Sequence, residues 1–206
     1  MNKLAENSQG IEARFLAMPV KIEKRNAGET ESRSIVGYGA VFNTLSENLG
    51  GFREKIAPGA FDTVLNDDVR GLINHNPGHV LGRTASGTLR LSIDAQGLRY
   101  DIDPPDTQYA RDLLVSMERG DVKESSFRFV VDEDKWEEDE EGRIVRTIIK
   151  ISRLLDVGPV TYPAYPDASA AQRSLDQWRQ EHHKAPEVDH EAEHRARDLQ
   201  LAELEN

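Results

Sequence analysis

Short runs of alternating polar and apolar residues, separated by turn residues, occupy the middle of the sequence and constrain its fold more than any other feature. Residues 88–93 and 98–102 alternate in this way on either side of Asp94-Ala95-Gln96-Gly97, a sequence typical of a hairpin turn. A side-chain period of two is the mark of a β-strand. Further runs with strand character are residues 15–22, 34–42, 125–131, 144–151 and 157–162. The chain is therefore predicted to be mainly β.

Two segments are predicted to be helical. Residues 60–65 follow Pro58-Gly59 and are short. Residues 107–117 follow Asp106, a good helix N-cap, and precede Gly120, which suits a helix end. The apolar residues of the second segment fall on one helical face: Tyr109, Leu113, Leu114 and Met117. Together these patterns predict an α+β fold, in which a barrel-like, largely antiparallel sheet is flanked by helices.

Composition excludes several classes of protein. The 206 residues include 37 acidic and 26 basic side chains, so the formal net charge is −11. Such an excess of acid disfavours a surface for polyanions, and no direct contact with nucleic acid is expected. Cysteine is absent, which excludes a disulfide framework, a thiolate zinc site and a cysteine nucleophile. The sequence has no run of about 18 apolar residues and no signal-peptide pattern, so we expect a soluble intracellular protein without membrane contact.

The distribution of charge along the chain predicts three parts. Residues 1–11 are polar and predicted to be flexible, and residues 12–168 are predicted to form the folded domain. Residues 169–206 are predicted to be a charged tail, either a solvated helix or disordered, because they hold too few apolar residues to offset the entropy of folding. Within the folded domain, residues 132–142 carry eight acids and are predicted to be an exposed hairpin loop.

Only two histidines lie outside this tail, in the sequence Leu72-Ile73-Asn74-His75-Asn76-Pro77-Gly78-His79. His75 ends an apolar run and precedes a turn signal, so its side chain can be both rigidly held and accessible. Imidazole titrates near neutral pH, which suits a general base. The alternatives are two ordinary loop histidines or a metal pair. Two histidines four residues apart bind metal well only on a helix, which Asn-Pro-Gly disfavours, so we expect no metal ligands and no cofactor.

Two adjacent serines open the strand predicted at residues 125–131. A period of two places Ser126 and Arg128 on one face and Phe127 and Phe129 on the other. The phenylalanines are expected to face the core, so Ser126 points toward a cleft or solvent. A serine hydroxyl becomes a nucleophile only when a neighbouring base removes its proton, and His75 is the natural candidate. The alternative is that Ser125 and Ser126 are ordinary polar residues at a strand start.

Asp156 lies inside the apolar strand sequence Leu154-Leu155-Asp156-Val157. A carboxylate in such a place must be paired or hydrogen-bonded, because burial of an unpaired charge is costly. It could orient an imidazole and stabilise its cationic form. It could equally form an ion pair with an arginine such as Arg153 or Arg83, and the residues themselves leave both interpretations open.

Taken together, these segments resemble the prohead (capsid maturation) protease family of tailed bacteriophages, which are serine peptidases related in fold to the herpesvirus assemblins. The resemblance covers about residues 12–168, and its pieces occur in the family's order. They are Gly37-Tyr38-Gly39-Ala40-Val41-Phe42, Glu54-Lys55-Ile56-Ala57-Pro58-Gly59-Ala60-Phe61, Asn74-His75, Leu81-Gly82-Arg83-Thr84, Gly97-Leu98, Ser126-Phe127-Arg128-Phe129, and Asp156-Val157 through Pro163-Ala164-Tyr165. No single piece is specific, but the ordered set is.

The resemblance implies a role for each candidate residue. Ser126 matches the family's nucleophile and His75 its general base. Asp156 is favoured as the third member of a catalytic triad, and the alternatives are Glu54 and Asp62. The implied reaction is hydrolysis of a peptide bond by acyl transfer.

Two positions depart from the family pattern. Arg128 stands where the family commonly has Gly, and Asn76 stands where Asp often follows the histidine. Arg128 is the feature that favours the rival interpretation, a non-catalytic capsid-assembly or scaffold module on the same fold. The oxyanion donors are expected to be backbone amides, assisted by an arginine such as Arg83.

The resemblance also implies partners and a location. The expected substrates are the major capsid protein with its scaffold segment, and the protein itself, inside the viral procapsid in the host cytoplasm. The portal and a second copy of this chain, in a homodimer or higher oligomer, are further candidate partners. Residues 170–206 are a candidate targeting or self-cleaved segment, with an expendable solubilising tail as the alternative.

Overall fold

The computed structural model describes residues 10–16, 18–27, 30–162 and 169–182. The chain divides into two compact units, Met1–Gln172 and Arg173–Asn206. The first unit contains strands β1 to β10 and helix α1. Helix α2 (Ser169–His182) begins the segment predicted to be a tail. The rest of that tail and most of the N-terminal segment predicted to be flexible lie outside the described residues.

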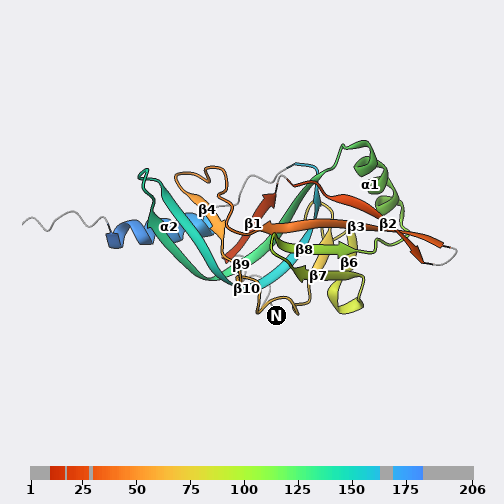
Figure 1. The fold of residues 1–206 in the computed structure, drawn as a ribbon, viewed down its shortest axis with the longest axis horizontal. Coiled ribbons are helices and arrows are strands. Elements are labelled where there is room, and N and C mark those ends of the chain that lie inside the picture. The colour runs from red at the N-terminus through yellow and green to blue at the C-terminus, as the bar shows by residue number, and fades with distance from the viewer. Residues whose placement is uncertain (1–9, 17, 28–29, 163–168, 183–206) are drawn as a thin grey trace, which may run out of the picture. The chain divides into compact units, whose positions relative to one another are not determined.

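The strands of the first unit form two sheets (Figure 1). The first sheet has the order β1-β9-β10-β5-β6, and β4 also pairs with β10. Strands β4 and β5 run parallel to β10, whereas the other pairs of both sheets are antiparallel. The second sheet has the order β2-β3-β8-β7. The strands are β1 (Ile11–Leu16), β2 (Lys21–Ala27), β3 (Thr30–Val41), β4 (Arg53–Ile56), β5 (Arg70–Leu72), β6 (Val80–Arg83), β7 (Leu89–Ile93), β8 (Gly97–Ile102), β9 (Glu124–Glu138) and β10 (Ile144–Val160).

The predicted fold class is confirmed: the first unit is mainly β, its strands are largely antiparallel, and helices accompany them. The hairpin predicted around Asp94–Gly97 is also present, as β7 and β8. Within the described part of the chain, the strands do not close into a barrel. The main strand order of each sheet instead ends in two terminal strands, β1 and β6 in the first and β2 and β7 in the second, and β4 branches from β10.

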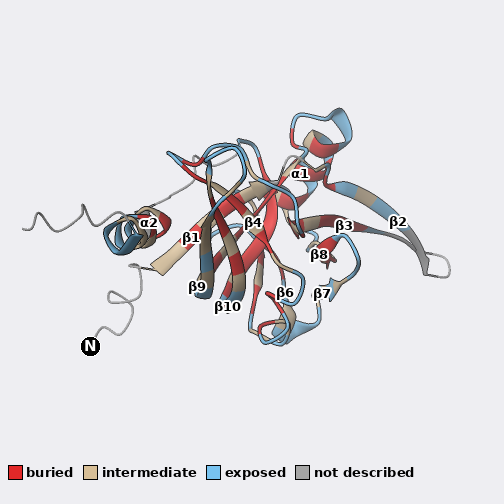
Figure 2. Ribbon diagram, turned by 60° about the vertical axis from the view of Figure 1, so that its left-hand side comes forward, coloured by how far each residue is buried: buried red, intermediate tan, exposed pale blue. Residues whose placement is uncertain are grey.

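The core contains the apolar faces of both sheets, and Figure 2 shows buried residues along the strands of each. Phe127 and Phe129 of β9 are buried there, and their rings stack with centroids 4.6 Å apart. Phe61 packs edge-on against Phe127 at 5.9 Å. The phenylalanine face of β9 therefore faces the core as predicted, and the opposite face of the strand carries Ser126 and Arg128.

Helix α1 (Gln108–Arg119) matches the predicted helix closely. Gly120 ends it with a left-handed φ of 83°, as the sequence predicts. The N-cap residue is Thr107 rather than Asp106. The Asp106 carboxylate instead accepts a hydrogen bond from the Arg111 guanidinium of the first helical turn. No helix within the described ranges combines the length and the hydropathy needed to cross a bilayer.

Residues 60–65 are not helical, which corrects the prediction. They form successive turns, in which the Val64 N–H donates to the Phe61 carbonyl at 3.0 Å. A helix this short cannot offset the entropy of nucleation by itself. The Ile151 N–H donates to the Ala60 carbonyl at 3.0 Å, so the turns are tied to β10 instead.

The single strand predicted at residues 15–22 is also wrong. Strand β1 ends at Leu16 and β2 begins at Lys21, and the two belong to different sheets. Pro19 lies between them and has no N–H to donate to a ladder. The chain therefore changes sheets at a point where the hydrophobic alternation continues.

The acidic segment 132–142 is mostly strand rather than loop. Strand β9 continues to Glu138, and only residues 139–143 form the turn before β10. Cross-strand ion pairs offset part of the negative charge, for example the 2.7 Å contact between Lys150 and Asp132. Because opposite charges across a ladder attract, a very acidic strand can still be paired.

Gly158 allows β5 to lie against β10. Strand β10 runs unbroken from Ile144 to Val160, where the sequence predicts two strands, and β5 pairs with it in parallel. A Cβ at position 158 would lie 2.0 Å from the carbonyl oxygen of Leu72, the last residue of β5, and φ at this glycine is +156°. Only glycine fits there. Because glycine has no side chain, the segment that follows β5 and carries His75 can lie against β10.

We expect Gly158→Ala to destabilise the protein by about 1–3 kcal/mol or more, because the backbone of β5 must move away from the added methyl group. Urea denaturation followed by circular dichroism measures the change. Gly10→Ala is the matched control, since a Cβ there meets only Val130 Cγ1 at 3.5 Å and should shift stability by under about 0.5 kcal/mol. Equal stability of the two variants would contradict the role assigned to Gly158.

Candidate active site

Ser126 lies near the start of β9, on the face opposite the phenylalanines. Its neighbour Ser125 points into the core, where its Oγ donates a 3.0 Å hydrogen bond to the Tyr100 hydroxyl. Ser126 is itself 0% exposed, because β1 pairs with β9 at this point and Phe15 stands opposite it. The Ser126 Oγ lies 2.8 Å from the carbonyl oxygen of Arg14, to which it can donate. The two adjacent serines therefore have different surroundings.

Asp156 lies on β10, on the same face as Ser126. The pairing of β9 with β10 sets Asp156 opposite Arg128 and Gly158 opposite Ser126. A register shift between Leu154 and Asp156 precedes this pairing. Asp156 is 2% exposed, and Arg128 Nε donates a 2.6 Å hydrogen bond to its Oδ2. The buried carboxylate therefore has a cationic partner in the neighbouring strand.

His75 lies in the turn that follows β5. Both Asn74 and His75 have left-handed backbone conformations, with φ of 51° and 56°. Asparagine and histidine adopt this conformation more readily than most residues other than glycine. The Asn74 N–H donates to the Pro159 carbonyl at 3.0 Å, and the Thr161 N–H donates to the Asn74 side chain at 2.7 Å. These bonds fix the turn to the end of β10 and so orient the imidazole.

The imidazole of His75 lies between Ser126 and Asp156. Its Nε2 is 2.6 Å from Ser126 Oγ, and its Nδ1 is 2.5 Å from Asp156 Oδ1. When Nδ1 carries the proton and donates it to the carboxylate, Nε2 is free to accept the serine proton. The His75 side chain is 15% exposed. The structure thus brings together three candidates that come from separate segments of the sequence, in an arrangement that can transfer a proton from a hydroxyl to a ring.

Arg128 is the part of this arrangement that the sequence did not reveal. The sequence suggests Arg153 or Arg83 as ion-pair partners of Asp156, but the partner is Arg128. One terminal nitrogen of its guanidinium also lies 3.5 Å from the His75 carbonyl oxygen. This pair could be predicted from the sequence only if the register of β9 on β10 were known. That register cannot be deduced from alternation, because it depends on the irregularities between the strands.

The two alternatives for the third residue lie elsewhere. Glu54 is bonded to Arg14 and Arg146 at 2.8–2.9 Å. Asp62 is exposed, in the turns that follow Gly59. Asp156 is the carboxylate that is hydrogen-bonded to His75.

The other side chains considered from the sequence have partners of their own. Arg83, the candidate oxyanion donor, forms a two-pronged ion pair with Asp68 at 2.7 and 2.6 Å. This hydrogen bonding lowers the pKa of the Asp68 carboxyl. His79 lies against the Tyr109 ring, and its Nδ1 is 3.2 Å from the Asn76 side-chain nitrogen. Across the described residues, no three His, Cys, Asp or Glu side chains gather as metal ligands would.

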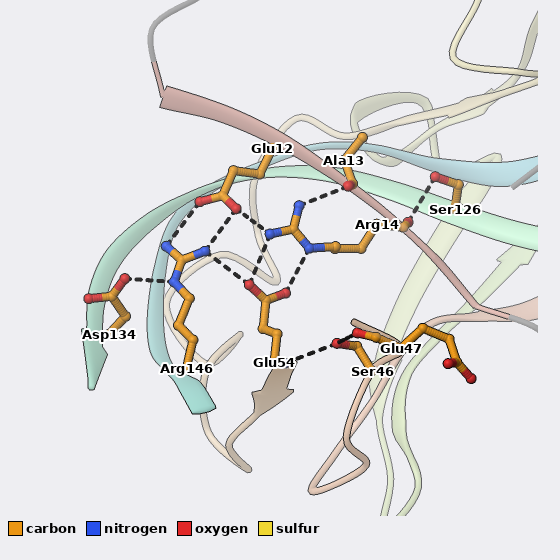
Figure 3. Close-up of polar contacts among 9 residues, drawn as sticks. All are labelled: Glu12, Ala13, Arg14, Ser46, Glu47, Glu54, Ser126, Asp134 and Arg146. Carbon is orange, nitrogen blue, oxygen red and sulfur yellow. Dashed lines mark hydrogen bonds and ion pairs between the residues drawn. The ribbon is translucent and has the colours of Figure 1, made fainter. Parts of the chain in front are cut away.

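A mostly buried group of charges holds β1 in place, and we call it the β1 cluster (Figure 3). It consists of Glu12, Arg14, Glu54, Asp134 and Arg146. Arg14 donates two hydrogen bonds to Glu54, at 2.8 and 2.9 Å, and a third to Glu12 at 2.5 Å. Arg146 contacts Glu12, Glu54 and Asp134 at 2.7–3.0 Å. The β1 cluster therefore joins β1 to β4, β9 and β10.

The carboxylates of the β1 cluster stabilise the charged form of both arginines. Burial by itself would lower the pKa of the Arg14 guanidinium, but Glu54 and Glu12 outweigh it and raise that pKa. The pKa of Arg146 is raised in the same way, against burial, chiefly by Glu12. Each buried cation thus depends on its carboxylates to offset the cost of desolvation.

Residues 19–181 match the family described as caudovirus prohead serine protease. The chain belongs to this family. Among curated proteins, none matches the sequence. Among solved structures, the capsid assembly protease gp21 of bacteriophage T4 is 10% identical, with a TM-score of 0.46 over 73% of this chain and 97% of that chain.

Membership of the prohead serine protease family confirms the resemblance seen in the sequence. It makes the chain a member of a serine peptidase family that acts in phage capsid maturation, and it implies an interaction with capsid proteins.

Asn74 is expected to contribute to stability in two separable ways. Asn74→Ala loses the two side-chain hydrogen bonds with Thr161 and adds the strain of a left-handed alanine, so we expect a loss of about 2–3 kcal/mol. Asn74→Gly keeps the backbone conformation and should lose only about 1 kcal/mol. Urea denaturation of both variants measures the difference, and a glycine variant less stable than the alanine variant would contradict it.

Arg146→Ala is expected to destabilise the protein by about 3–5 kcal/mol, because it leaves buried carboxylates short of a cation. Thermal and urea denaturation measure this loss. The matched control is Arg143→Ala, whose side chain is 42% exposed and pairs with Asp139 and Glu141. Surface ion pairs contribute at most about 1 kcal/mol, so the control should remain close to wild type.

Proposed function

We propose that the protein is a serine endopeptidase in which Ser126 is the nucleophile, His75 the general base and Asp156 the residue that holds the imidazole. The observation that carries the proposal is the continuous hydrogen-bonded chain from Ser126 Oγ through both ring nitrogens of His75 to Asp156. Membership of a serine protease family supports it independently.

In the proposed mechanism, Ser126 Oγ attacks the carbonyl carbon of a peptide bond while His75 Nε2 takes the serine proton. His75 then gives this proton to the departing amine, which leaves an acyl ester on Ser126. A water molecule, deprotonated by His75, hydrolyses the ester and restores the serine. Asp156 accepts the Nδ1 hydrogen bond throughout and stabilises the imidazolium when it forms.

Arg128 has a positioning role in this mechanism. Asp156 is almost fully buried, so it needs a second partner besides the ring that it orients. The Arg128 guanidinium occupies Oδ2 and leaves Oδ1 for His75. The residue that departs from the family's sequence pattern thus supports the arrangement instead of disrupting it.

The proposed substrates are the major capsid protein with its scaffold segment, and the chain itself. These follow from the family's role in prohead maturation. We place the reaction inside the procapsid in the host cell, where the portal and further copies of this chain are additional proposed partners. Residues 170–206 are proposed to target the protein to the procapsid or to be removed by self-cleavage.

A second candidate function is that of a non-catalytic capsid-assembly module. One observation favours it: Ser126 is fully covered, and its hydroxyl is bonded to the chain's own backbone. An enzyme must uncover this serine before it can act, whereas an assembly module need not. Co-expression with the major capsid protein separates the two functions.

We expect the wild-type chain, co-expressed with its cognate major capsid protein, to trim that protein or itself. Ser126→Ala and His75→Ala should abolish trimming, since loss of a triad member costs on the order of 10⁴-fold or more in turnover. Intact-mass spectrometry of the products measures this.

Ser125→Ala is the matched control, because Ser125 is the neighbouring serine and its hydroxyl faces Tyr100. This variant should keep cutting at a rate close to wild type. If it stops cutting while Ser126→Ala continues, the nucleophile is misassigned. If all chains leave both proteins whole while shells still assemble, the assembly module replaces the enzyme.

A further inference from the structure

The hydroxyl of Ser126 has two acceptors but one proton. His75 Nε2 lies 2.6 Å from Oγ. The Arg14 carbonyl oxygen lies 2.8 Å from Oγ, and Figure 3 shows this contact. With Nδ1–H donated to Asp156, both Nε2 and the Arg14 carbonyl can only accept. A serine proton given to Arg14 is not available to His75. Strand β1 therefore competes with the base for the proton that catalysis must remove.

Strand β1 also occupies the edge of the sheet at which a peptide would reach Ser126. It is the terminal strand of its sheet in the described residues, and β9 is its pairing partner there. Their antiparallel register sets Phe15 opposite Ser126 and Arg14 opposite Phe127. An extended peptide that adds to an exposed strand gains main-chain hydrogen bonds in this manner. The carbonyl oxygen of the peptide bond between Arg14 and Phe15 thus lies against the Ser126 hydroxyl.

We propose that β1 is an internal occupant of the substrate site, and that the peptide which displaces it carries a basic residue in the place of Arg14. The site is the edge of β9 from Ser126 to Val130, together with the carboxylate of Glu54. In the protein without a bound peptide, β1 prevents Ser126 from reacting. This inference rests on the proposed function, because it assumes that Ser126 attacks peptides.

The charges of the β1 cluster indicate the basic residue. Glu12 and Arg14 belong to β1 and cancel each other, so the net charge of the cluster is −1 with or without β1, but removal of β1 takes Arg14 away from Glu54. Glu54 would then keep one of its three side-chain hydrogen bonds, the 2.9 Å contact with Arg146. Glu54 is 4% exposed when β1 covers it, so a peptide seated in place of β1 buries it again and leaves it poorly paired unless the peptide supplies a cation. An arginine or lysine from the incoming strand restores its partner.

The family match adds an independent point. It begins at residue 19, so β1 lies before the matched region, whereas Ser126, His75 and Asp156 lie inside it. Strand β1 is thus separable in sequence from the segment that carries the proposed chemistry. Since β1 and β2 belong to different sheets, β1 can leave β9 without breaking the second sheet.

Reaction of Ser126 with a fluorophosphonate probe tests whether β1 covers the serine. We expect Arg14→Ala, which removes the hydrogen bonds to Glu54 and Glu12, to be labelled at least about tenfold faster than wild type. Arg143→Ala, which removes an exposed ion-paired arginine, should be labelled at the wild-type rate. Equal labelling of wild type and Arg14→Ala would overturn the covering role of β1.

An exchange experiment tests the site without relying on catalysis or on the folding of a weakened variant. A recognition sequence for a specific protease is inserted after Leu16 in a full chain that carries Ser126→Ala, and the folded protein is cut there. A fluorescent peptide, Gly-Ile-Glu-Ala-Arg-Phe-Leu, should replace the severed strand. The same peptide with Lys in place of Arg should bind with an affinity within a few-fold of the original. The peptide with Glu in place of Arg, called the Glu peptide, should bind at least about tenfold more weakly. Failure to exchange, or equal binding of the Glu peptide, would overturn the proposal.

The two experiments separate this inference from the proposed function. If Ser126 is labelled rapidly in every chain, the assignment of Ser126 as the nucleophile stands and the covering role of β1 is rejected. The opposite outcome is that the Arg peptide exchanges selectively but Ser126 is not labelled, even after the cut in a chain that retains the serine. In that case the peptide site on β9 stands and the catalytic role of Ser126 is rejected.

Discussion

The antiparallel pairing of β9 with β10 is the interaction on which the rest of the site depends. It sets Ser126 and Arg128 on the same face as Asp156 and Gly158, while Phe127 and Phe129 anchor the opposite face in the core. Because side chains alternate along a strand, a slip of one residue in this register would turn Ser126 toward the core and the phenylalanines away from it. The packing energy of the aromatic face thus fixes the position of the polar one.

The imidazole is supplied by a turn that two unusual features hold in place. Gly158 has no side chain, which lets β5 approach β10, and Asn74 ties the turn to the end of β10. Asn74 and His75 both adopt left-handed backbone conformations, which for residues other than glycine cost free energy. The surrounding hydrogen bonds offset that cost, so strain in the turn and stability of the sheet are coupled through the same strand.

Strand β1 links stability to access. Its charges are buried, and a buried ionic cluster is a less efficient way to hold a strand than apolar packing, because the ions must be desolvated. Within the proposal, such a cluster selects a strand that carries the right charges in the right order. On the proposed view, the same contacts that seat β1 in the resting protein describe the peptide that replaces it, and removal of a matched pair of charges leaves a site that still demands a cation.

The sequence by itself determined the mainly β character, the aromatic face of β9 and the end of α1, and through its motifs it offered Ser126 and His75, with Asp156 favoured over Glu54 and Asp62. Each of these follows from local periodicity, from turn chemistry or from a motif. The sequence could not determine that residues 60–65 form turns, that β1 and β2 separate at Pro19, or that Arg128 is the partner of Asp156. It also gave no sign that Arg14 reaches Ser126. These features depend on contacts between segments that are far apart in the chain, and such contacts are set by the register of strands and by burial, which only the tertiary structure decides.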